Sequence, residues 1–495
     1  MTPVMPQIEK IVFLMLENRS LDNVLGWLYD GQELSPDRVF PAGSPLQFAG
    51  ASQDDYNYVG TTGYAPNLGT QNLPSPMRQP RWNPNEWWHN IGNQMYWDAY
   101  GHDAVPRWSP THTPPMTGFA VDYAKDYDSS GEVMGAYSRD QLPVLYGLAE
   151  NYAVSDRWFS SIPTETNPNR AFSVCGSSQG ALNNADTTYF TLPTIFNRLS
   201  EAPAPKKTWG IYWQYKGIFG MDPNWFHKKC FTADIFTQIG PLLDAKRGKL
   251  GTRDEFFDAL KSDDLPDFSY LEPFWGGGYG WPNGEDFFGL QGNDYHPPQW
   301  VGQGEWDLNE LYNALRNSQY WENMLFIITF DEHGGTWDHV PPTKTVPPDK
   351  IKSDPPFAFD RLGPRVPTIL VSPYICPGTV FRSPDKVFDF DHTSFIATIL
   401  GWAGIDPKQA NLGTRVAIAP TFEGVLATTR YPDPPAIVVP AEYRHQGGPK
   451  GPHNLPFPVD GLDIRTFRAL MHESRNEKDF IERLRAFEVR PHDEG

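Results

Sequence analysis

Two apolar stretches of the chain end in side chains that could together hold a metal ion. The stretches are residues 8–16 and 324–330. The residues directly after them are Glu17, Asn18, Asp331 and Glu332. Neighbouring carboxylates repel each other unless a cation lies between them, and carboxylate and amide oxygens suit a hard divalent cation. The two stretches therefore predict one divalent metal site, although Asp331 and Glu332 could equally begin a solvated loop.

A hydroxyl-rich turn could supply a nucleophile. Its sequence, SSIPTETNPNR at 160–170, holds Thr164 and Thr166 and follows a stretch that we expect to be a strand. A hydroxyl at a strand-to-helix turn can become a nucleophile when a metal or another neighbour lowers its pKa. The residue types leave the choice between the two threonines open, because either could also be an ordinary helix N-cap.

Two histidines and an arginine are further candidates for a site. His296 lies near Asp294 in the loop sequence NDYHPP, where it could transfer protons or make a structural hydrogen bond. His392 lies at the start of a predicted helix, where it could reach a site or act as a cap. Arg19 could contact an anionic group or pair with Asp22.

The elements that must position these side chains are buried strands and amphipathic helices. Apolar runs such as residues 324–330 are typical of strands buried on both faces of a parallel sheet. Such a strand running into two carboxylates suits an open α/β sheet, which binds its ligands at the carboxyl ends of its strands. Further strands are expected at 153–159, 208–214 and 366–372. Helices are expected at 142–152, 306–317, 390–400 and 479–488.

The length of 495 residues allows a large core, and the 49 prolines and 43 glycines indicate long ordered loops. Residues 30–85 and 215–300 are predicted to be largely irregular. The proline-rich residues 431–458 are predicted to form a linker or an arm across the surface. We expect a catalytic domain at residues 1–424, followed at 425–495 by the arm and a C-terminal helix.

The net charge of −19 bears on the partners. It argues against nucleic acid, because that affinity rests on basic surface. It also repels an anionic membrane at long range, but it permits an anionic substrate, because a bound metal can invert the local field.

The cysteines and the N-terminus bear on the compartment. The three cysteines form no CxxC, so a disulfide framework is not expected, although one incidental bridge is possible. The first apolar run carries Glu9 and Lys10, is too short to span a bilayer and lacks the features of a signal peptide. We expect a cytoplasmic or peripheral membrane protein, secreted only if a signal peptide has been removed.

Seven stretches, in the same order, resemble the phosphoesterase family of bacterial and plant non-specific phospholipases C and related acid phosphatases. They run through about four fifths of the chain. The stretches are ENRSLDNVLG at 17–26, PPMTGFAVDY at 114–123, TNPNR at 166–170, NDYHPP at 293–298, DEHGGTWDHV at 331–340, RLGPRVPTILVSPY at 361–374 and DHTSF at 391–395. The resemblance implies an alkaline-phosphatase-like α/β/α sandwich with a mostly parallel sheet and long decorated loops.

The resemblance also implies roles for individual residues. It implies one divalent metal ion of unknown identity, bound by Glu17, Asn18, Asp331 and Glu332. It implies that Thr166, at the T-x-P-N-R position, is the nucleophile and forms a phosphothreonine intermediate, with Arg170 in the same motif. His296 matches the family's histidine that serves the leaving group or binds phosphate. The resemblance also implies that three further residues lie beside the phosphate or contact the residues just named. They are Asp338, His339 and His392.

One position departs from the family pattern. The family usually carries D-P-G-H-x-[FW] ahead of Q-x-[YF], whereas this chain has NPNEWW at 83–88, so that Glu86 replaces the histidine. A carboxylate cannot donate to phosphate unless it is protonated, and it repels a phosphate dianion. Glu86 could therefore be protonated, His89 or His102 could substitute for the histidine, or the activity could differ.

The resemblance implies a phosphoric ester hydrolase, and we expect a phospholipase C acting on glycerophospholipids. The alternatives are a phosphomonoesterase of the acid phosphatase type and a non-catalytic relative that binds a phosphorylated ligand. The expected partner is a phospholipid or a phosphorylated small molecule. A tryptophan-rich segment suggests transient contact with a membrane surface, or else an aromatic cluster packed among loops. Its tryptophans are Trp82, Trp87, Trp88, Trp97 and Trp108.

Overall fold

A mixed sheet forms the centre of the protein. The computed structural model describes residues 2–70, 73, 76–97, 113–127, 130–187, 189–202, 206–214, 230–274, 292–444 and 483. Within these residues the sheet has nine strands in the order β2-β13-β7-β12-β11-β1-β10-β8-β9. They are β1 Lys10–Leu16, β2 Val39–Phe40, β7 Ala153–Ser155, β8 Trp209–Trp213, β9 Lys249–Thr252, β10 Phe268–Glu272, β11 Met324–Phe330, β12 Thr368–Val371 and β13 Thr379–Phe381.

The two apolar runs noted in the sequence are neighbours at the centre of this sheet. Strands β1 and β11 pair in parallel, with Lys10 opposite Met324 and Leu16 opposite Phe330. Every residue of β11 is buried, which explains why the run is apolar on both faces. Strand β12 is antiparallel to both of its neighbours, and the other pairings in the sheet are parallel.

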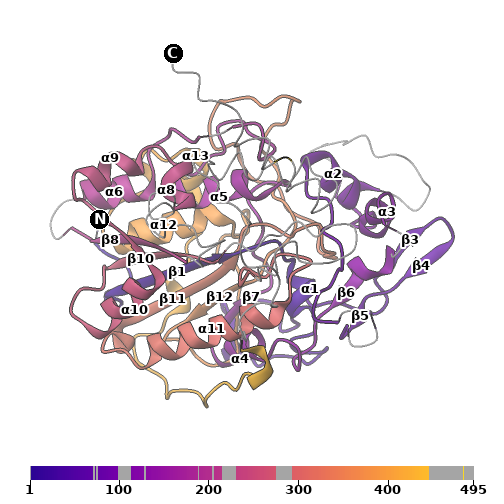
Figure 1. The fold of residues 1–495 in the computed structure, drawn as a ribbon, viewed down its shortest axis with the longest axis horizontal. Coiled ribbons are helices and arrows are strands. Elements are labelled where there is room, and N and C mark those ends of the chain that lie inside the picture. The colour runs from indigo at the N-terminus through magenta and orange to yellow at the C-terminus, as the bar shows by residue number, and fades with distance from the viewer. Residues whose placement is uncertain are drawn as a thin grey trace.

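Helices cover both faces of the sheet (Figure 1). One face carries α5 Thr166–Val174, α6 Ile195–Glu201 and α12 His392–Trp402, with α8 Phe231–Ile235, α9 Ile239–Asp244 and α13 Thr414–Ile418 beside them. The other face carries α4 Pro143–Asn151, α10 Arg253–Lys261 and α11 Val301–Arg316. The expected α/β class, with helices on both faces of a mostly parallel sheet, is therefore confirmed.

A smaller lobe lies at one end of the sheet (right in Figure 1). It consists of α1 Leu21–Leu25, α2 Trp88–Tyr96, α3 Phe119–Ala124, β3 Asn57–Val59, β4 Thr62–Tyr64, β5 Asn67–Leu68 and β6 Gly135–Ala136. Elsewhere, short 3-10 turns span Pro36–Arg38, Ser130–Met134, Trp321–Asn323, Pro407–Gln409, Glu423–Val425 and Ala441–Tyr443. The lobe carries Glu86 toward the carboxyl ends of β1 and β11.

The expectation that residues 215–300 are irregular is wrong for much of their described part. That part contains α8, α9, β9, α10 and β10, and β10 pairs directly with β1. The sequence of β10, FSYLE, is buried throughout, but Ser269 and Glu272 interrupt its apolar pattern. The strand expected at 153–159 is also shorter, ending at Ser155, because Trp158 and Phe159 form only isolated bridges.

The C-terminal arm is described as far as residue 444. It follows α11 and α4 along the edge of the molecule, where Arg316 Nη2 donates to the Pro434 carbonyl at 2.7 Å and Tyr443 Oη donates to the Gln141 carbonyl at 3.1 Å. Of the helix expected at 479–488, only Arg483 falls within the described residues. All three cysteines are free. Among the described helices, none is long and apolar enough to cross a membrane.

Candidate active site

The register of β1 against β11 brings the two predicted groups of oxygen ligands together. Because Leu16 lies opposite Phe330, Glu17 and Asp331 leave the sheet at the same level. Asp331 Oδ1 accepts the backbone N–H of Asn18 at 3.0 Å and that of Glu332 at 2.7 Å. Asn18 has a φ of +57°, a left-handed conformation that asparagine adopts more readily than most residues. The four residues Glu17, Asn18, Asp331 and Glu332 therefore follow two paired strands at the same edge of the sheet.

This cluster carries more negative than positive charge. Burial, followed by the charge of Asp331, raises the pKa of Glu17 well above its usual range, although Arg170 opposes the shift. Burial and the charges of Glu86 and Asp331 raise the pKa of Glu332 in the same way. Arg170 compensates for part of this charge, because its Nη2 lies 2.9 Å from Glu17 Oε1 and its Nε lies 3.3 Å from Asp331 Oδ2.

The residues present suit a divalent cation by their chemistry. Among the described residues, three buried oxygens in the cluster accept no hydrogen bond, namely Asn18 Oδ1, Asp331 Oδ2 and Glu332 Oε1, although Arg170 Nε lies 3.3 Å from Asp331 Oδ2. Buried carboxylate and amide oxygens that accept no hydrogen bond are suitable ligands for such an ion. Across the described residues, however, no three Asp, Glu, His or Cys side chains are gathered as a complete ligand set, and Arg170 bridges Glu17 and Asp331. Metal binding therefore stays a prediction.

Helix α5 presents Thr166 on the side that faces this cluster. Thr166 is its first residue and Arg170 lies four residues later, so the two share a helix face. Thr166 is 9% exposed, and its hydroxyl makes none of the hydrogen bonds found among the described residues. The competing Thr164 donates its hydroxyl to the Leu182 carbonyl and is almost fully buried. The geometry therefore favours Thr166 over Thr164 as the residue with a free hydroxyl.

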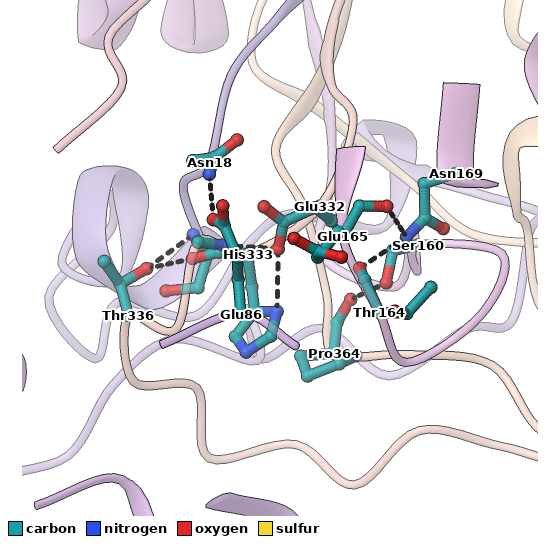
Figure 2. A network of polar contacts seen from close by, with 12 residues as sticks. Asn18, Glu86, Ser160, Thr164, Glu165, Asn169, Glu332, His333, Thr336 and Pro364 are labelled. Atoms are coloured by element: carbon teal, nitrogen blue, oxygen red, sulfur yellow. Dashed lines mark hydrogen bonds and ion pairs between the residues drawn. The ribbon is translucent and has the colours of Figure 1, made fainter. Parts of the chain in front are cut away.

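His296 and Glu86 meet at Asn18. Asn18 Nδ2 donates to Glu86 Oε2 and lies 3.0 Å from His296 Nε2. Figure 2 shows the Asn18 amide against Glu86, with Glu332 and Glu165 beside them. Burial lowers the pKa of His296 to about 4, so that the metal-free protein holds this ring neutral at pH 7. Burial and the charges of Glu165 and Asp331 raise the pKa of Glu86 well above its usual range.

His392 supports the cluster from α12. Its Nε2 lies 2.6 Å from the Asp331 carbonyl oxygen and donates to it, and the ring is fully buried. Burial lowers the pKa of His392. Because a carbonyl only accepts, this bond fixes the backbone that carries Asp331.

Asp338 and His339 belong to a separate ionic network. Arg365 Nε lies 2.9 Å from Asp338 Oδ1, and Arg365 Nη2 lies 2.9 Å from Asp22 Oδ1. His339 Nδ1 lies 2.6 Å from Asp22 Oδ2. The expected placement of Asp338 and His339 beside the phosphate receives no support from these contacts.

Among the described residues Arg19 does not pair with Asp22, because it bonds the neighbouring loops, and its contact with an anionic group stays a prediction. Its Nε donates to the Tyr295 carbonyl at 2.7 Å, its Nη1 donates to Asn23 Oδ1 at 3.0 Å, and Nη1 also donates to the Gln79 carbonyl. Asp22 pairs with Arg365 instead. Arg19 therefore holds the loop that carries His296.

Glu165 is a residue near the site that the sequence reasoning missed. It precedes Thr166, is 6% exposed and accepts the backbone N–H of Asn184 at 2.7 Å. Burial raises the pKa of Glu165 to about 7. An acidic residue directly before the candidate nucleophile was the available signal.

The tryptophan-rich segment is mostly packed. Trp88 is buried against residues of α5 and the 357–359 loop, and Trp82 stacks on Tyr127 with ring centroids 5.8 Å apart. Trp87 is the exception, with 59% of its surface exposed, and the exposed His89 sets its ring edge against it. His89 therefore contacts Trp87 and not Asn18 in the place of a missing histidine. His102 and Trp108 lie outside the described residues.

Several phospholipases C are similar in sequence to most of this chain. It is 33% identical over 441 residues to non-specific phospholipase C5 of Arabidopsis thaliana, which covers 85% of this chain and 74% of that protein. It is 33% identical over 455 residues to non-specific phospholipase C4 of the same plant, covering 88% and 75%. It is 27% identical over 437 residues to phospholipase C B of Mycobacterium tuberculosis, covering 80% and 74%.

Solved structures match only weakly. A protein of the alkaline phosphatase superfamily from Vibrio parahaemolyticus is 14% identical, with a TM-score of 0.31 over 57% of this chain and 64% of that one. We draw no conclusion from an overlap of this size. The Phosphoesterase family model, in contrast, matches residues 8–404, a span that includes every proposed site residue. The chain therefore belongs to the Phosphoesterase family.

Proposed function

We propose that this phosphoesterase is a phospholipase C that cleaves glycerophospholipids to diacylglycerol and a phosphorylated headgroup. The observation that carries the proposal is the meeting of Glu17, Asn18, Asp331 and Glu332 at the ends of β1 and β11, with α5 facing them. The named relatives at 33% identity support the substrate class.

Thr166 is proposed to attack phosphorus. The threonine hydroxyl gives up its proton as the Oγ1–P bond forms, while the bond from phosphorus to the glycerol oxygen breaks, and diacylglycerol is released once that oxygen gains a proton. Water then forms a bond to phosphorus and the Oγ1–P bond breaks. One proton of the water goes to Oγ1, which restores the threonine hydroxyl, and the phosphorylated headgroup departs. Arg170, four residues after Thr166, keeps a positive charge close to the developing negative charge.

One divalent cation is proposed at this site, with Glu17, Asn18, Asp331 and Glu332 as its ligands. When bound, such an ion would lower the pKa of the threonine hydroxyl and polarise a phosphoryl oxygen. His296 is proposed to exchange a proton with the leaving group or to bind phosphate. His392 keeps Asp331 in place through its backbone carbonyl.

Glu86 favours a diester over a monoester substrate. Its carboxylate reaches Asn18 and lies close enough to Glu165 and Asp331 for their charges to raise its pKa. Whether it is protonated or ionised, a carboxyl offers no positive charge where the family pattern has a histidine, and this disfavours a phosphate dianion more than a diester monoanion. We therefore prefer phospholipase C to a phosphomonoesterase.

The test is hydrolysis of p-nitrophenyl phosphorylcholine compared with p-nitrophenyl phosphate, each with EDTA and after metal add-back. Preference for the diester, with loss of turnover in EDTA, is expected. Preference for the monoester would move the assignment to a phosphatase. Turnover of neither compound, with metal shown to be bound, would favour a relative that only binds a phosphorylated ligand.

A further inference from the structure

Tyr295, the residue before His296, has a backbone conformation that tyrosine rarely adopts. Its φ is +70°, in the left-handed region. A bulky residue keeps this conformation only where the surrounding contacts hold it, and such residues gather at functional sites. The Tyr295 ring is 1% exposed and packs edge-on against Phe330, with ring centroids 5.7 Å apart. His296, the next residue, instead brings Nε2 to 3.0 Å from Asn18 Nδ2. The turn therefore separates a buried anchor from a candidate catalytic side chain.

The Tyr295 side chain is anchored on α11. Its Oη donates to Glu305 Oε1 at 2.7 Å. Glu305 also accepts the N–H groups of Val144 and Leu145, at 2.5 and 3.2 Å, in the first turn of α4. The Glu305 side chain is fully buried, so water does not compete for these bonds. The phenol is therefore tied to two helices that pack side by side on one face of the sheet (Figure 1).

Gly304 leaves the room that the Tyr295 ring occupies. A Cβ at this position of α11 would lie 2.4 Å from Tyr295 Cε2 and 2.6 Å from Cδ2. Alanine is otherwise the better residue inside a helix, because glycine loses more backbone freedom when the helix forms. The close approach of the ring gives this glycine a packing role, and any larger residue would displace the ring.

The backbone of the same loop is held from the side of the sheet. Arg19 Nε donates to the Tyr295 carbonyl at 2.7 Å, and the Glu17 N–H donates to the Asp294 carbonyl at 2.8 Å. The His296 N–H donates to Asp294 Oδ1 at 3.2 Å. The loop is therefore fixed between the strand ends on one side and α11 on the other, and the Tyr295 side chain makes the contact with α11.

We propose that Tyr295 is a positioning residue for His296, whose bond to Glu305 and packing on Gly304 hold the turn that places the imidazole beside Asn18. The inference rests on the proposed function, in which His296 serves the leaving group or binds phosphate. Tyr295 acts through His296 and not on the substrate. Misplacing a reacting group by about 1 Å can slow a reaction by about 100-fold, so loss of the anchor should be visible in turnover.

A double-mutant cycle on kcat/KM for p-nitrophenyl phosphorylcholine tests this role in the full-length protein supplied with divalent metal ions. Tyr295→Phe removes the bond to Glu305 and should lower kcat/KM by about tenfold. In the His296→Ala background the same substitution should cost less than about twofold, because no imidazole is left to position. Equal losses in the two backgrounds, or no loss in either, would overturn the inference.

Gly304→Ala is a second perturbation that displaces the Tyr295 ring without removing a polar group. It should lower kcat/KM in the same way as Tyr295→Phe. A readout that does not depend on turnover is the rate at which diethyl pyrocarbonate modifies His296, followed by mass spectrometry of the peptide. Both variants should raise this rate several-fold, because the imidazole leaves Asn18. An unchanged rate in both variants would contradict positioning.

Two substitutions are matched controls. Tyr152→Phe removes a buried hydroxyl that lies 2.9 Å from Tyr312 Oη on α11, away from the loop. Gly240→Ala adds a methyl group in α9, where a Cβ would meet no atom within 4 Å. Each should leave kcat/KM and the modification rate of His296 within about twofold of the unsubstituted protein. Losses in these controls equal to that of Tyr295→Phe would assign the effect to stability and overturn positioning.

The unsubstituted protein and His296→Ala separate this inference from the proposed function. If the unsubstituted protein hydrolyses the diester and His296→Ala slows it, while Tyr295→Phe changes neither kcat/KM nor the modification rate, only the role of Tyr295 fails. If the unsubstituted protein hydrolyses neither p-nitrophenyl ester, the proposed function fails, and the role of Tyr295 fails with it.

Discussion

Two of the buried ionic clusters among the described residues differ in how their charges are balanced. In the structural cluster, Asp22 and Asp338 share Arg365, and His339 also contacts Asp22. None of these side chains has a buried polar atom without a hydrogen bond. The second cluster, which we call the acidic cluster, consists of Glu17, Glu86, Asp331 and Glu332 around Asn18 and Arg170. Three of its buried oxygens have no hydrogen bond.

The direction of the pKa shift follows this difference for Asp22 but not for Asp338. Although burial acts against it, His339 and Arg365 lower the pKa of Asp22. Burial still raises the pKa of Asp338 to about 6. In the acidic cluster, burial and neighbouring carboxylates raise the pKa values of Glu17 and Glu332 well above their usual range. A balanced network stabilises the fold by itself, whereas unbalanced buried charge needs a further cation or proton.

The largest effect should come from Thr166, because we propose that the reaction takes place beside the acidic cluster. Thr166→Ala should reduce turnover of p-nitrophenyl phosphorylcholine by at least about 10⁴-fold, since the attacking oxygen is lost. Thr164→Val is the control, and it should retain more turnover because its hydroxyl only bonds the Leu182 carbonyl. Near-normal turnover by Thr166→Ala would end the nucleophile assignment.

Arg365→Ala should produce the largest loss of stability. It leaves the buried carboxylates of Asp22 and Asp338 without their guanidinium, a change that typically costs about 3–5 kcal/mol of unfolding free energy. Urea unfolding followed by circular dichroism measures the change. A loss below about 1 kcal/mol would show that the structural cluster is not what holds this part of the fold together.

Glu305 is a third kind of buried carboxylate, which accepts hydrogen bonds but forms no ion pair with any Arg, Lys or His that the structure describes. It accepts from Tyr295 Oη at 2.7 Å and from the Val144 and Leu145 N–H groups of α4, yet burial raises its pKa to about 7. Since the folded-state pKa exceeds the unfolded value, the unfolding free energy should fall as pH rises from about 4.5 to 7.

The size of this fall should be up to about 3 kcal/mol. It is measured as the difference in unfolding free energy between the unsubstituted protein and Glu305→Gln across that pH range. A difference that does not change with pH would contradict the prediction.

Two matched substitutions should have opposite signs in metal-free protein. Glu332→Gln should raise the unfolding free energy by about 1–2 kcal/mol, because it relieves repulsion in the acidic cluster, while Asp338→Asn should lower it by a similar amount. Both are measured by urea unfolding in EDTA. If the two changes have the same sign, the two clusters do not differ in charge balance in the way described above.

The smallest expected effect concerns the membrane surface, away from both clusters. Trp87 is 59% exposed, whereas Trp88 is buried, so of these two neighbours Trp87 is the one available to a lipid interface. We propose that Trp87→Ala weakens co-sedimentation with phosphatidylcholine vesicles several-fold, or by about 1 kcal/mol. Trp82→Phe, which keeps an aromatic ring at the packed position, is the control. Unchanged sedimentation of Trp87→Ala would remove the proposed contact.

The sequence predicts the central strands well because burial on both faces leaves a continuous apolar run. Strand β11 is found at the predicted residues, and β1 begins two residues later than expected. Strand β10 was missed because Ser269 and Glu272 interrupt its apolar pattern, although the strand is just as buried. Local pattern therefore identifies a central strand only where its side chains are uniformly apolar.

The site was predictable in its residue types but not in its contacts. Strand-end carboxylates could be recognised because they follow apolar runs directly. The bond between Asn18 and Glu86 joins residues 68 positions apart, and the partners of Arg19 lie on two distant loops. Nothing local in the chain encodes these contacts, because they depend on how the loops pack over the sheet.

The acidic cluster is proposed to be a divalent cation site. The most direct measurement is the thermal unfolding of the unsubstituted protein in EDTA and after add-back of Mg²⁺, Ca²⁺ or Mn²⁺, beside Asp331→Asn. At least one ion should raise Tm in a concentration-dependent way, and Asp331→Asn should lose this response. A Tm that no ion changes, or an equal rise in Asp331→Asn, would contradict it.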